Sequence, residues 1–163
     1  MPSRVQSIVT IKETERTIDF NLELNEVINA IRGTRINSEG VEEIVYVDFE
    51  KIIPMPDDLS AYSDPYHEIS NDRMWRTINW GTKNNTIDSE VEGNQISFWT
   101  AWAPAAPVIC ELSRQFPNFR FVVEFGSCEA GYFGSYEAVA GEIYYYKDED
   151  YDCSQDLKAA LNI

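Results

Sequence analysis

Two tryptophan motifs in this sequence could bind a ligand. In Asn79-Trp80-Gly81-Thr82-Lys83, a tryptophan lies beside a lysine. Such a pair can stack on a base or hold a peptide. The alternative is structural, because large aromatic side chains next to turns usually pack inside. Trp80 would then belong to the core, Gly81 would adopt a positive φ and Lys83 would be solvated.

The second motif contains Trp99 and Trp102, followed by Pro104. These residues could form an aromatic interaction patch. Strand alternation would send Trp102 to the same face as Phe98 and Thr100, and Trp99 to the opposite face. We therefore expect at least one of the two tryptophans in the core.

An acidic, tyrosine-rich segment near the C-terminus is the most unusual part of the sequence. It could be a strand edge followed by a solvated turn, which is the common fate of a charge run. It could also be a binding surface, in which carboxylates imitate phosphates and tyrosines supply contact area. The candidate contact residues are Asp148, Glu149, Asp150, Asp152, Tyr144, Tyr146 and Tyr151, together with Asp57 and Asp58 from an earlier acidic segment.

Catalytic and metal-binding patterns are not evident. His67 is the lone histidine and lies in a polar segment without an identifiable nucleophile motif. Cys110, Cys128 and Cys153 are far apart and form no CxxC pair, so free thiols are expected rather than a disulfide framework or a zinc site. The sequence has no P-loop, GxGxxG, HExxH or EF-hand pattern. We therefore expect no catalytic residues, no metal and no cofactor.

The charge is strongly negative. The 163 residues carry 28 acids against 13 bases, a net charge of −15. The excess lies in residues 37–72 and 121–163, on either side of a near-neutral segment. Such a field repels nucleic acid and anionic membranes and attracts basic protein surfaces. No stretch approaches the length of a membrane span and residues 1–10 lack a signal-peptide core, so the cytoplasm is the expected compartment.

The elements that position these residues follow from periodicity and turn signals. In the first half we expect strands at 5–11 and 44–53, and between them a helix over 22–31 with Gly33 as its C-cap. A loop or short helix should follow at 60–72. An aromatic segment, 74–80, should then lead into a turn at Gly81.

The second half predicts a hairpin followed by alternating helices and strands. Strands at 86–91 and 95–101 flank a turn at Gly93-Asn94. A helix opens after Pro104 and Pro107, with Ile109, Leu112 and Phe116 buried. A strand is expected at 119–125 and another at 138–146, with turns at Gly126, Gly131 and Gly134 between them. A final helix over 155–161 should be capped by Ser154. The order predicts a single α+β domain over residues 1–163, an antiparallel sheet covered by helices mainly on one face.

Three motifs, in order and spacing, resemble those of YubB-type proteins with a ferredoxin-like domain, found on phages and plasmids. They are residues 47–59 (VDFEKIIPMPDDL), 79–84 (NWGTKN) and 98–104 (FWTAWAP), the last continuing to Phe116-Pro117. The resemblance covers about 45–135 and the N-terminal strand, and implies a ferredoxin-like fold and a mobile-element origin. Asn84 and Ala103 depart from the pattern, which has a second tryptophan and a serine there, and the acidic end lies outside it. Within the motifs we expect Trp80, Gly81, Lys83, Trp102 and Pro104 to be structural.

These observations favour a non-enzymatic acidic protein that binds the basic surface of a host or phage protein. The expected partner binds nucleic acid, for example a CRISPR effector or a restriction enzyme, and the chain would inhibit it by competing with the phosphate backbone. Direct binding to nucleic acid or membranes is not expected. Two alternatives stay open: a small carboxylate-dependent enzyme with Lys83 in a cleft, and an accessory oligomerisation module whose charge maintains solubility.

Overall fold

The computed structural model describes residues 3–129 and 131–150, with side chains described as far as Asp148. It contains eight strands, three α-helices and two short 3₁₀ helices. In chain order these are β1 (Arg4–Glu13), α1 (Phe20–Ile31), β2 (Gly33–Ile36), β3 (Glu42–Val45), η1 (Phe49–Lys51), η2 (Ser60–Tyr62), α2 (Asn71–Asn79), β4 (Ile87–Glu92), β5 (Gln95–Ala101), α3 (Ala106–Gln115), β6 (Phe119–Ser127), β7 (Tyr132–Val139) and β8 (Glu142–Asp150).

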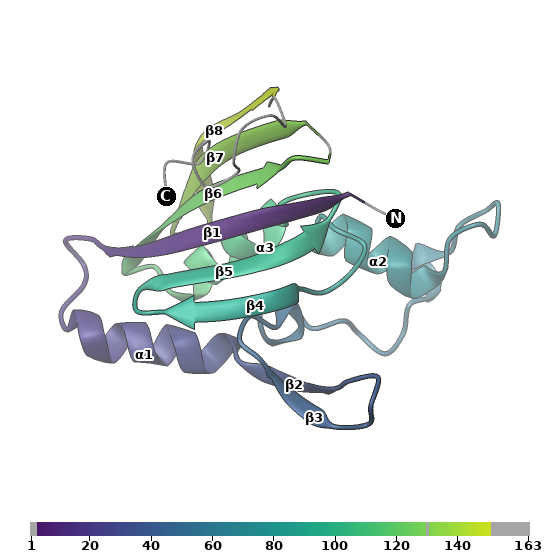
Figure 1. Ribbon diagram of the computed structural model, residues 1–163, viewed down its shortest axis with the longest axis horizontal. Coiled ribbons are helices and arrows are strands. Elements are labelled where there is room, and N and C mark those ends of the chain that lie inside the picture. The colour runs from purple at the N-terminus through teal and green to yellow at the C-terminus, as the bar shows by residue number, and fades with distance from the viewer. Residues whose placement is uncertain (1–2, 130, 151–163) are drawn as a thin grey trace.

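The main sheet has six antiparallel strands in the order β4-β5-β1-β6-β7-β8 (Figure 1). Within it, β1-α1-β4-β5-α3-β6 follows the β-α-β-β-α-β order of a ferredoxin-like unit. Each helix connects two strands that are separated by a third, β5 in one case and β1 in the other. The fold is therefore α+β with a ferredoxin-like core, as the sequence predicted. The unit is extended by an insertion between α1 and β4 and by β7 and β8 beyond β6.

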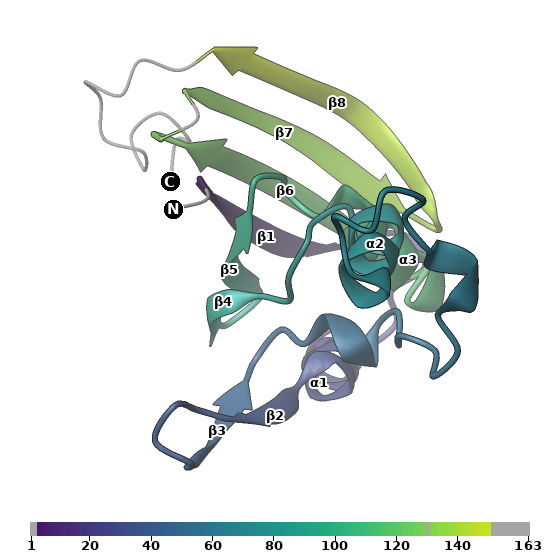
Figure 2. The same ribbon diagram turned by 90° about the vertical axis from the view of Figure 1, so that its right-hand side faces the viewer.

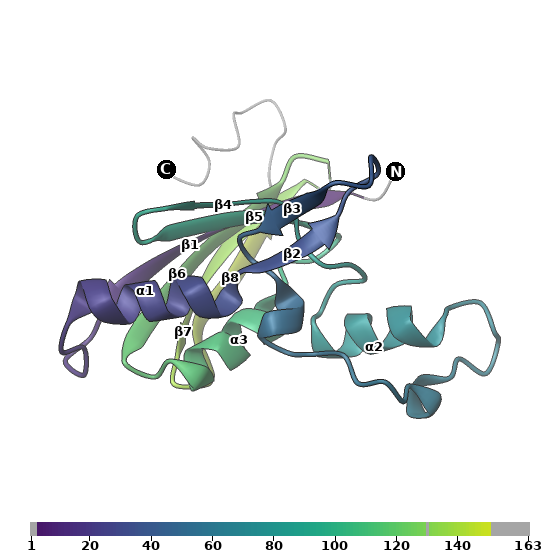
Figure 3. The same ribbon diagram turned by 90° about the horizontal axis from the view of Figure 1, so that it is seen from below.

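The two helices of this unit, α1 and α3, lie on the same side of the sheet (Figures 2 and 3). Strand alternation supplies the apolar face that they cover, because every second residue of β1, β5 and β6 is buried. Asp19 caps α1 by accepting a hydrogen bond from the Leu22 amide. Leu24, Val27 and Ile31 then recur at helical spacing and join the core.

The segment after α1 differs from the expectation. Gly33 is not a C-cap: α1 ends at Ile31, Arg32 caps it in an extended conformation, and Gly33 begins β2. A Cβ at Gly33 would collide with the Asp48 side chain, so glycine is needed there for close approach. The expected strand at 44–53 ends at Val45, because the Asp48 carboxylate accepts a hydrogen bond from the Glu50 amide and starts η1 instead. Residues 74–80 belong largely to α2, and Gly81, with φ +74°, makes the expected turn after it.

The expected strand at 138–146 is interrupted by a hairpin turn: residues 138–139 end β7, residues 140–141 form the turn, and residues 142–146 begin β8. Strands β7 and β8 pair on either side of Ala140 and Gly141, whose φ angles are +50° and +84°. Two positive φ angles are typical of a two-residue hairpin turn, but an alanine in the first position gives little sequence signal. Gly126 and Gly134 lie inside β6 and β7 rather than in turns, whereas Gly131, with φ +72°, does lie in a turn. The helix expected at 155–161 lies outside the described residues.

The core contains α3, as predicted. Ile109 and Leu112 are fully buried, and Phe116 is partly buried against them. We expect Leu112→Ala to lower the free energy of unfolding by about 2–5 kcal/mol, because a leucine truncation in a packed core leaves a cavity. Leu22→Ala, at an exposed position of α1, should change it by less than about 0.5 kcal/mol. Urea denaturation of both variants measures the difference, and equal effects would contradict the placement of α3.

Among the described residues, no helix has the length and apolarity needed to cross a membrane.

Candidate functional site

The loop between β5 and α3 holds Trp102 on a strained backbone. Trp102 has φ +73°, in the left-handed region that non-glycine residues rarely adopt. The Ala103 N–H donates to the Ala101 carbonyl oxygen at 2.9 Å and closes a three-residue turn centred on Trp102. A γ-turn with positive φ at its centre is the rare, strained form. Such strain persists where neighbouring groups hold the backbone, and it is concentrated at functional sites.

Hydrogen bonds from three parts of the chain hold this turn. The Trp102 N–H donates to the Ser3 carbonyl at 2.8 Å, and the Tyr132 hydroxyl donates to the Trp102 carbonyl at 2.8 Å. The Thr82 hydroxyl donates to the Ala101 carbonyl at 2.7 Å. Burial raises the pKa of Tyr132 to about 12, so its hydroxyl keeps the proton that it donates at neutral pH.

Trp102 is 58% exposed. The expectation from strand alternation therefore fails at this residue, because β5 ends at Ala101 and the turn sends Trp102 outward. It holds for the residues before the turn, since Phe98 and Thr100 are buried and Trp99 is only partly buried on the other face. The prediction that at least one of the two tryptophans lies in the core is therefore wrong. The result is an exposed aromatic ring on a fixed backbone.

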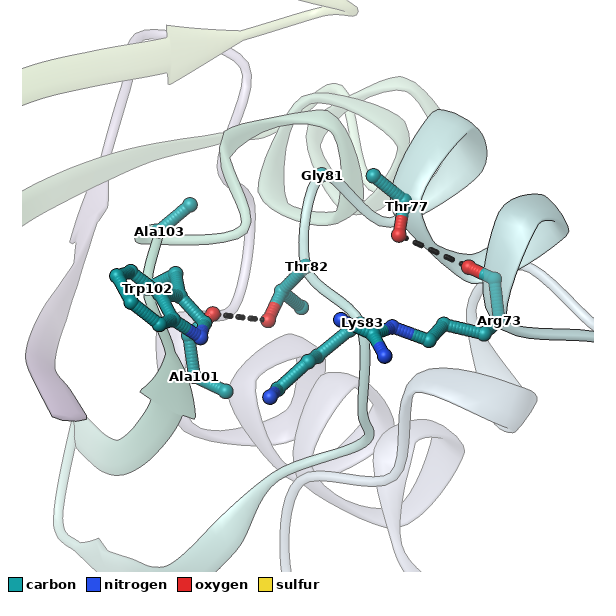
Figure 4. A pocket seen from close by; sticks show the side chains of 8 residues that line it. All are labelled: Arg73, Thr77, Gly81, Thr82, Lys83, Ala101, Trp102 and Ala103. Carbon is teal, nitrogen blue, oxygen red and sulfur yellow. Dashed lines mark hydrogen bonds between the residues drawn. The ribbon is translucent and has the colours of Figure 1, made fainter. Parts of the chain in front are cut away.

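Next to this ring is a pocket of about 360 Å³ (Figure 4). Its lining contains two cations and no carboxylate. The Lys83 Nζ lies over the Trp102 ring, 5.9 Å from its centroid, and in Figure 4 the Arg73 side chain extends toward Lys83. The residues that line the pocket are Arg73, Thr77, Gly81, Thr82, Lys83, Ala101, Trp102 and Ala103.

Two features bring α2 and the following segment to the pocket. Arg76 pairs with Asp72 at 3.1 Å, and its Nε donates to the Lys83 carbonyl at 2.5 Å, which ties Lys83 to the helix that carries Arg73. Gly81 makes the intervening turn, and a Cβ there would lie 2.8 Å from the Pro107 ring. Glycine is thus required at Gly81 both for its positive φ and for contact with α3.

Trp80, in contrast, is part of the core. It is 2% exposed, and its indole N–H donates to the Ile53 carbonyl at 2.9 Å. Its ring meets those of Phe49 and Trp75 edge to face at 5.6 and 5.5 Å. Pro104 is buried as well. Of the residues expected to be structural, these two lie inside, whereas Lys83 and Trp102 meet at the surface.

The predicted acidic binding surface falls on β8, at one edge of the main sheet (Figure 1). Tyr144, Lys147 and Asp148 are exposed, and Tyr145, which sequence inspection did not single out, is 79% exposed with φ +56°. The pairing of β7 with β8 shifts register at this point, which turns Tyr145 outward. Within the described part of the chain, no other segment forms backbone hydrogen bonds to the outer side of β8.

The other predicted contact residues are distributed differently. Tyr146 is 49% exposed, although its ring stacks on Tyr136 at 5.7 Å and lies 5.9 Å from Phe125. The backbones of Glu149 and Asp150 continue β8. Tyr151 and Asp152 lie outside the described residues.

Asp57 and Asp58 are exposed in the loop between η1 and η2, which lies apart from β8 (Figures 1 and 3). Asp58 accepts a hydrogen bond from the Ser60 amide at 3.0 Å, and this bond lowers the pKa of its carboxyl. Asp57 and Asp58 are thus not continuous with the β8 surface.

Histidine and cysteine side chains do not gather in the described structure. His67 is exposed in the loop before α2. The Cys110 thiol donates to the Gly141 carbonyl at 3.1 Å, and burial raises its pKa, which leaves it protonated. Cys153 lies outside the described residues. No group of three or more His, Cys, Asp or Glu side chains in the described residues is placed to hold a metal ion.

Sequence inspection missed Arg73 as a neighbour of the tryptophan motif. A signal was present, because residues 73–83 carry Arg73, Arg76 and Lys83 against no acid, in a chain with more than twice as many acids as bases. Sequence periodicity does not show that α2 packs against the loop between β5 and α3. That packing brings Arg73 and Lys83 to Trp102.

Comparisons with known proteins identify a family and a similar structure. Residues 79–161, about half of the chain, match the family model described as a ferredoxin-like domain in Api92-like protein. No curated protein matches the chain. The crystal structure of a protein api92 from Yersinia pseudotuberculosis is similar at a TM-score of 0.49 and 16% sequence identity, over 69% of this chain and 43% of that one. The chain thus spans less than half the length of that protein.

Proposed function

The chain belongs to the family of ferredoxin-like domains in Api92-like proteins, and we propose that it is a non-enzymatic binding protein. Its β8 edge occupies the basic surface of a nucleic-acid-binding protein and excludes nucleic acid from it. One observation carries this proposal: β8 is an edge strand with exposed tyrosines at Tyr144 and Tyr145 and an acidic run that begins at Asp148. Tyrosine supplies apolar contact area with a polar tip, and it is enriched at protein interfaces.

The spacing of acids along a strand supports competition with nucleic acid. Residues of a β-strand rise about 3.3 Å each, and the phosphates of one DNA strand recur about every 3.4 Å along the helix axis. A run of acids along a strand therefore has, over its two faces together, a linear charge density close to that of one DNA strand, and about half of that density on either face. The net charge of −15 adds long-range attraction toward a basic partner, which speeds association and makes it sensitive to salt.

The opposite edge of the sheet is less suited to this role. Strand β4 also exposes three acids, Asp88, Glu90 and Glu92, but no aromatic residue. Its outer side is approached by the β2–β3 hairpin region, where the Tyr46 amide donates to the Ser89 hydroxyl at 3.0 Å. Strand β8 therefore offers the more accessible of the two edges among the described residues.

The partner that we propose is a host defence protein that binds nucleic acid. The motifs around Trp80 and Trp102 resemble those of YubB-type proteins from phages and plasmids. For such an element, the useful target in the host cytoplasm is a defence protein that holds nucleic acid, such as a CRISPR effector or a restriction enzyme. Asp and Glu side chains would occupy the Lys and Arg residues that otherwise contact phosphates.

Competitive capture tests this function. Immobilised protein is incubated with bacterial lysate at low salt, and bound proteins are eluted with duplex DNA of mixed sequence. We expect nucleic-acid-binding proteins in the DNA eluate, because DNA and the chain compete for one basic surface. In a parallel gel-shift at physiological salt, the isolated chain should leave duplex DNA unshifted. Captured proteins that DNA does not displace, or a submicromolar shift by the chain itself, would contradict the proposal.

A further inference from the structure

We propose that the pocket beside Trp102 binds a small anion that carries a planar ring, of the chemical class of a nucleoside 5′-monophosphate. The base would stack on the exposed indole of Trp102, and Arg73 and Lys83 would hold the phosphate. This site is separate from the β8 edge and does not rest on the function proposed for it.

The charges around the pocket favour an anionic ligand. Its lining contains Arg73 and Lys83 and no carboxylate, although acids outnumber bases 28 to 13 in the whole chain. Neither cation forms an ion pair with a carboxylate whose side chain is described, whereas the neighbouring Arg76 is neutralised by Asp72. Two cations from different segments line one opening, and an anion bound there would be attracted by both.

The aromatic ring of Trp102 favours a ligand with a planar base. Lys83 Nζ lies 5.9 Å from the Trp102 ring centroid, near the outer limit of about 6 Å for a cation–π contact. The ammonium can therefore turn toward a phosphate at little cost. Stacking of bases on aromatic side chains is sequence-tolerant, because every base has a π-face. Arginine adds a planar fork of donors that matches phosphate oxygens.

The Trp102 ring is held in place before a ligand binds. The Trp102 backbone is strained, and bonds to Ser3, Thr82 and Tyr132 hold the turn from three directions. A ring presented in this way loses little conformational freedom when a ligand binds, so more of the contact energy appears as affinity. Strained backbone is common at ligand sites, and at Trp102 it presents an exposed aromatic ring beside the pocket.

The size of the pocket favours one nucleotide over a polymer. Its volume of about 360 Å³ lies at the lower end of the roughly 300–1,000 Å³ typical of small-molecule sites. A long nucleic acid would bring many phosphates into the field of a protein with a net charge of −15, whereas a mononucleotide brings one.

Isothermal titration calorimetry of the full chain tests this site, with AMP as the probe and adenosine and inorganic phosphate as its two halves. AMP should bind at least about tenfold more tightly than either half alone, since it engages both the indole and the cations. Equal affinity for AMP and phosphate would overturn the stacking contact, and equal affinity for AMP and adenosine would overturn the phosphate contact. Absence of measurable AMP binding would overturn the site as a whole.

Substitutions locate the binding. Trp102→Ala and Lys83→Gln should each weaken AMP binding by about tenfold or more, and Trp102→Phe should restore part of the loss. Arg120→Gln is the matched control, because Arg120 lines a second groove, of about 710 Å³, that also contains Glu13, Glu15 and Glu142. Thermal melts verify that each variant folds. AMP affinity that is lost in Arg120→Gln and kept in folded Lys83→Gln would place the ligand in the other groove and overturn the proposal.

Discussion

Trp80→Ala should lower the free energy of unfolding by about 3–5 kcal/mol, the range for truncating a large aromatic side chain in a core. Trp80 is among the largest fully buried side chains of the described structure, and it packs edge to face on Phe49 and Trp75. Its removal also leaves the Ile53 carbonyl without the donor it has now. A buried acceptor without a partner costs a further 1–3 kcal/mol or so where water cannot reach it.

Trp102→Ala is the matched control, since the residue type is the same and the other tryptophan is exposed. We expect it to lower stability by about 1 kcal/mol at most, well below the Trp80 variant, because Trp102 is 58% exposed and alanine keeps the same backbone turn. Urea denaturation followed by far-ultraviolet circular dichroism compares the two variants without relying on tryptophan emission. A larger loss in Trp102→Ala than in Trp80→Ala would reverse the roles assigned to the two motifs.

Neutralising the acids of β8 should weaken binding to a captured partner by at least about tenfold at about 0.1 M salt, which corresponds to about 1.4 kcal/mol. The variant combines Asp148→Asn, Glu149→Gln and Asp150→Asn. Charges at the rim of an interface act mainly on the association rate, whereas a desolvated charge pair costs about 2–5 kcal/mol when one partner is removed. The variant should therefore associate more slowly and dissociate faster than the parent chain. Its affinity should also depend less on the salt concentration.

The sheet supplies a control for this variant at its other edge. Asp88→Asn, Glu90→Gln and Glu92→Gln remove the same charge from exposed positions of β4. Asparagine also tolerates the positive φ of +49° at Asp88. Net charge, secondary structure and edge position are thus matched, and the location of the charge differs. Equal losses in both variants would mean that total charge, rather than β8, governs binding.

Sequence patterns predicted the elements with strong periodicity and regular turns. The alternation in β1, the stripe that contains Ile109 and Leu112 and the turn at Gly93 all correspond to elements of the structure. The errors arose where a side chain overrode propensity or a turn lacked its usual residues. Asp48 ends an apparent strand by capping η1, and Ala140 occupies a turn position where asparagine or glycine is expected.

The candidate sites were predictable to different degrees. The acidic run at Asp148 is visible as composition, and strand geometry adds that it lies on an edge. The pocket was not predictable, because Lys83 and Trp102 belong to separate motifs and are joined by tertiary packing. Alternation placed Trp102 on the buried face, and a γ-turn reversed this. Local deviations from a regular pattern are expected at functional sites, and the γ-turn at Trp102 lies beside the pocket.

The most direct test of the proposed function is the equilibrium dissociation constant for a captured nucleic-acid-binding partner, measured for the parent chain, the β8 variant and the β4 variant. Titrations at salt concentrations from about 50 to 200 mM cover the range in which charge-driven binding changes most. We expect tight, salt-dependent binding by the parent and the β4 variant, weaker and less salt-dependent binding by the β8 variant, and displacement of the parent by duplex DNA. Affinity that is unchanged in the β8 variant and insensitive to both salt and DNA would contradict the proposed function.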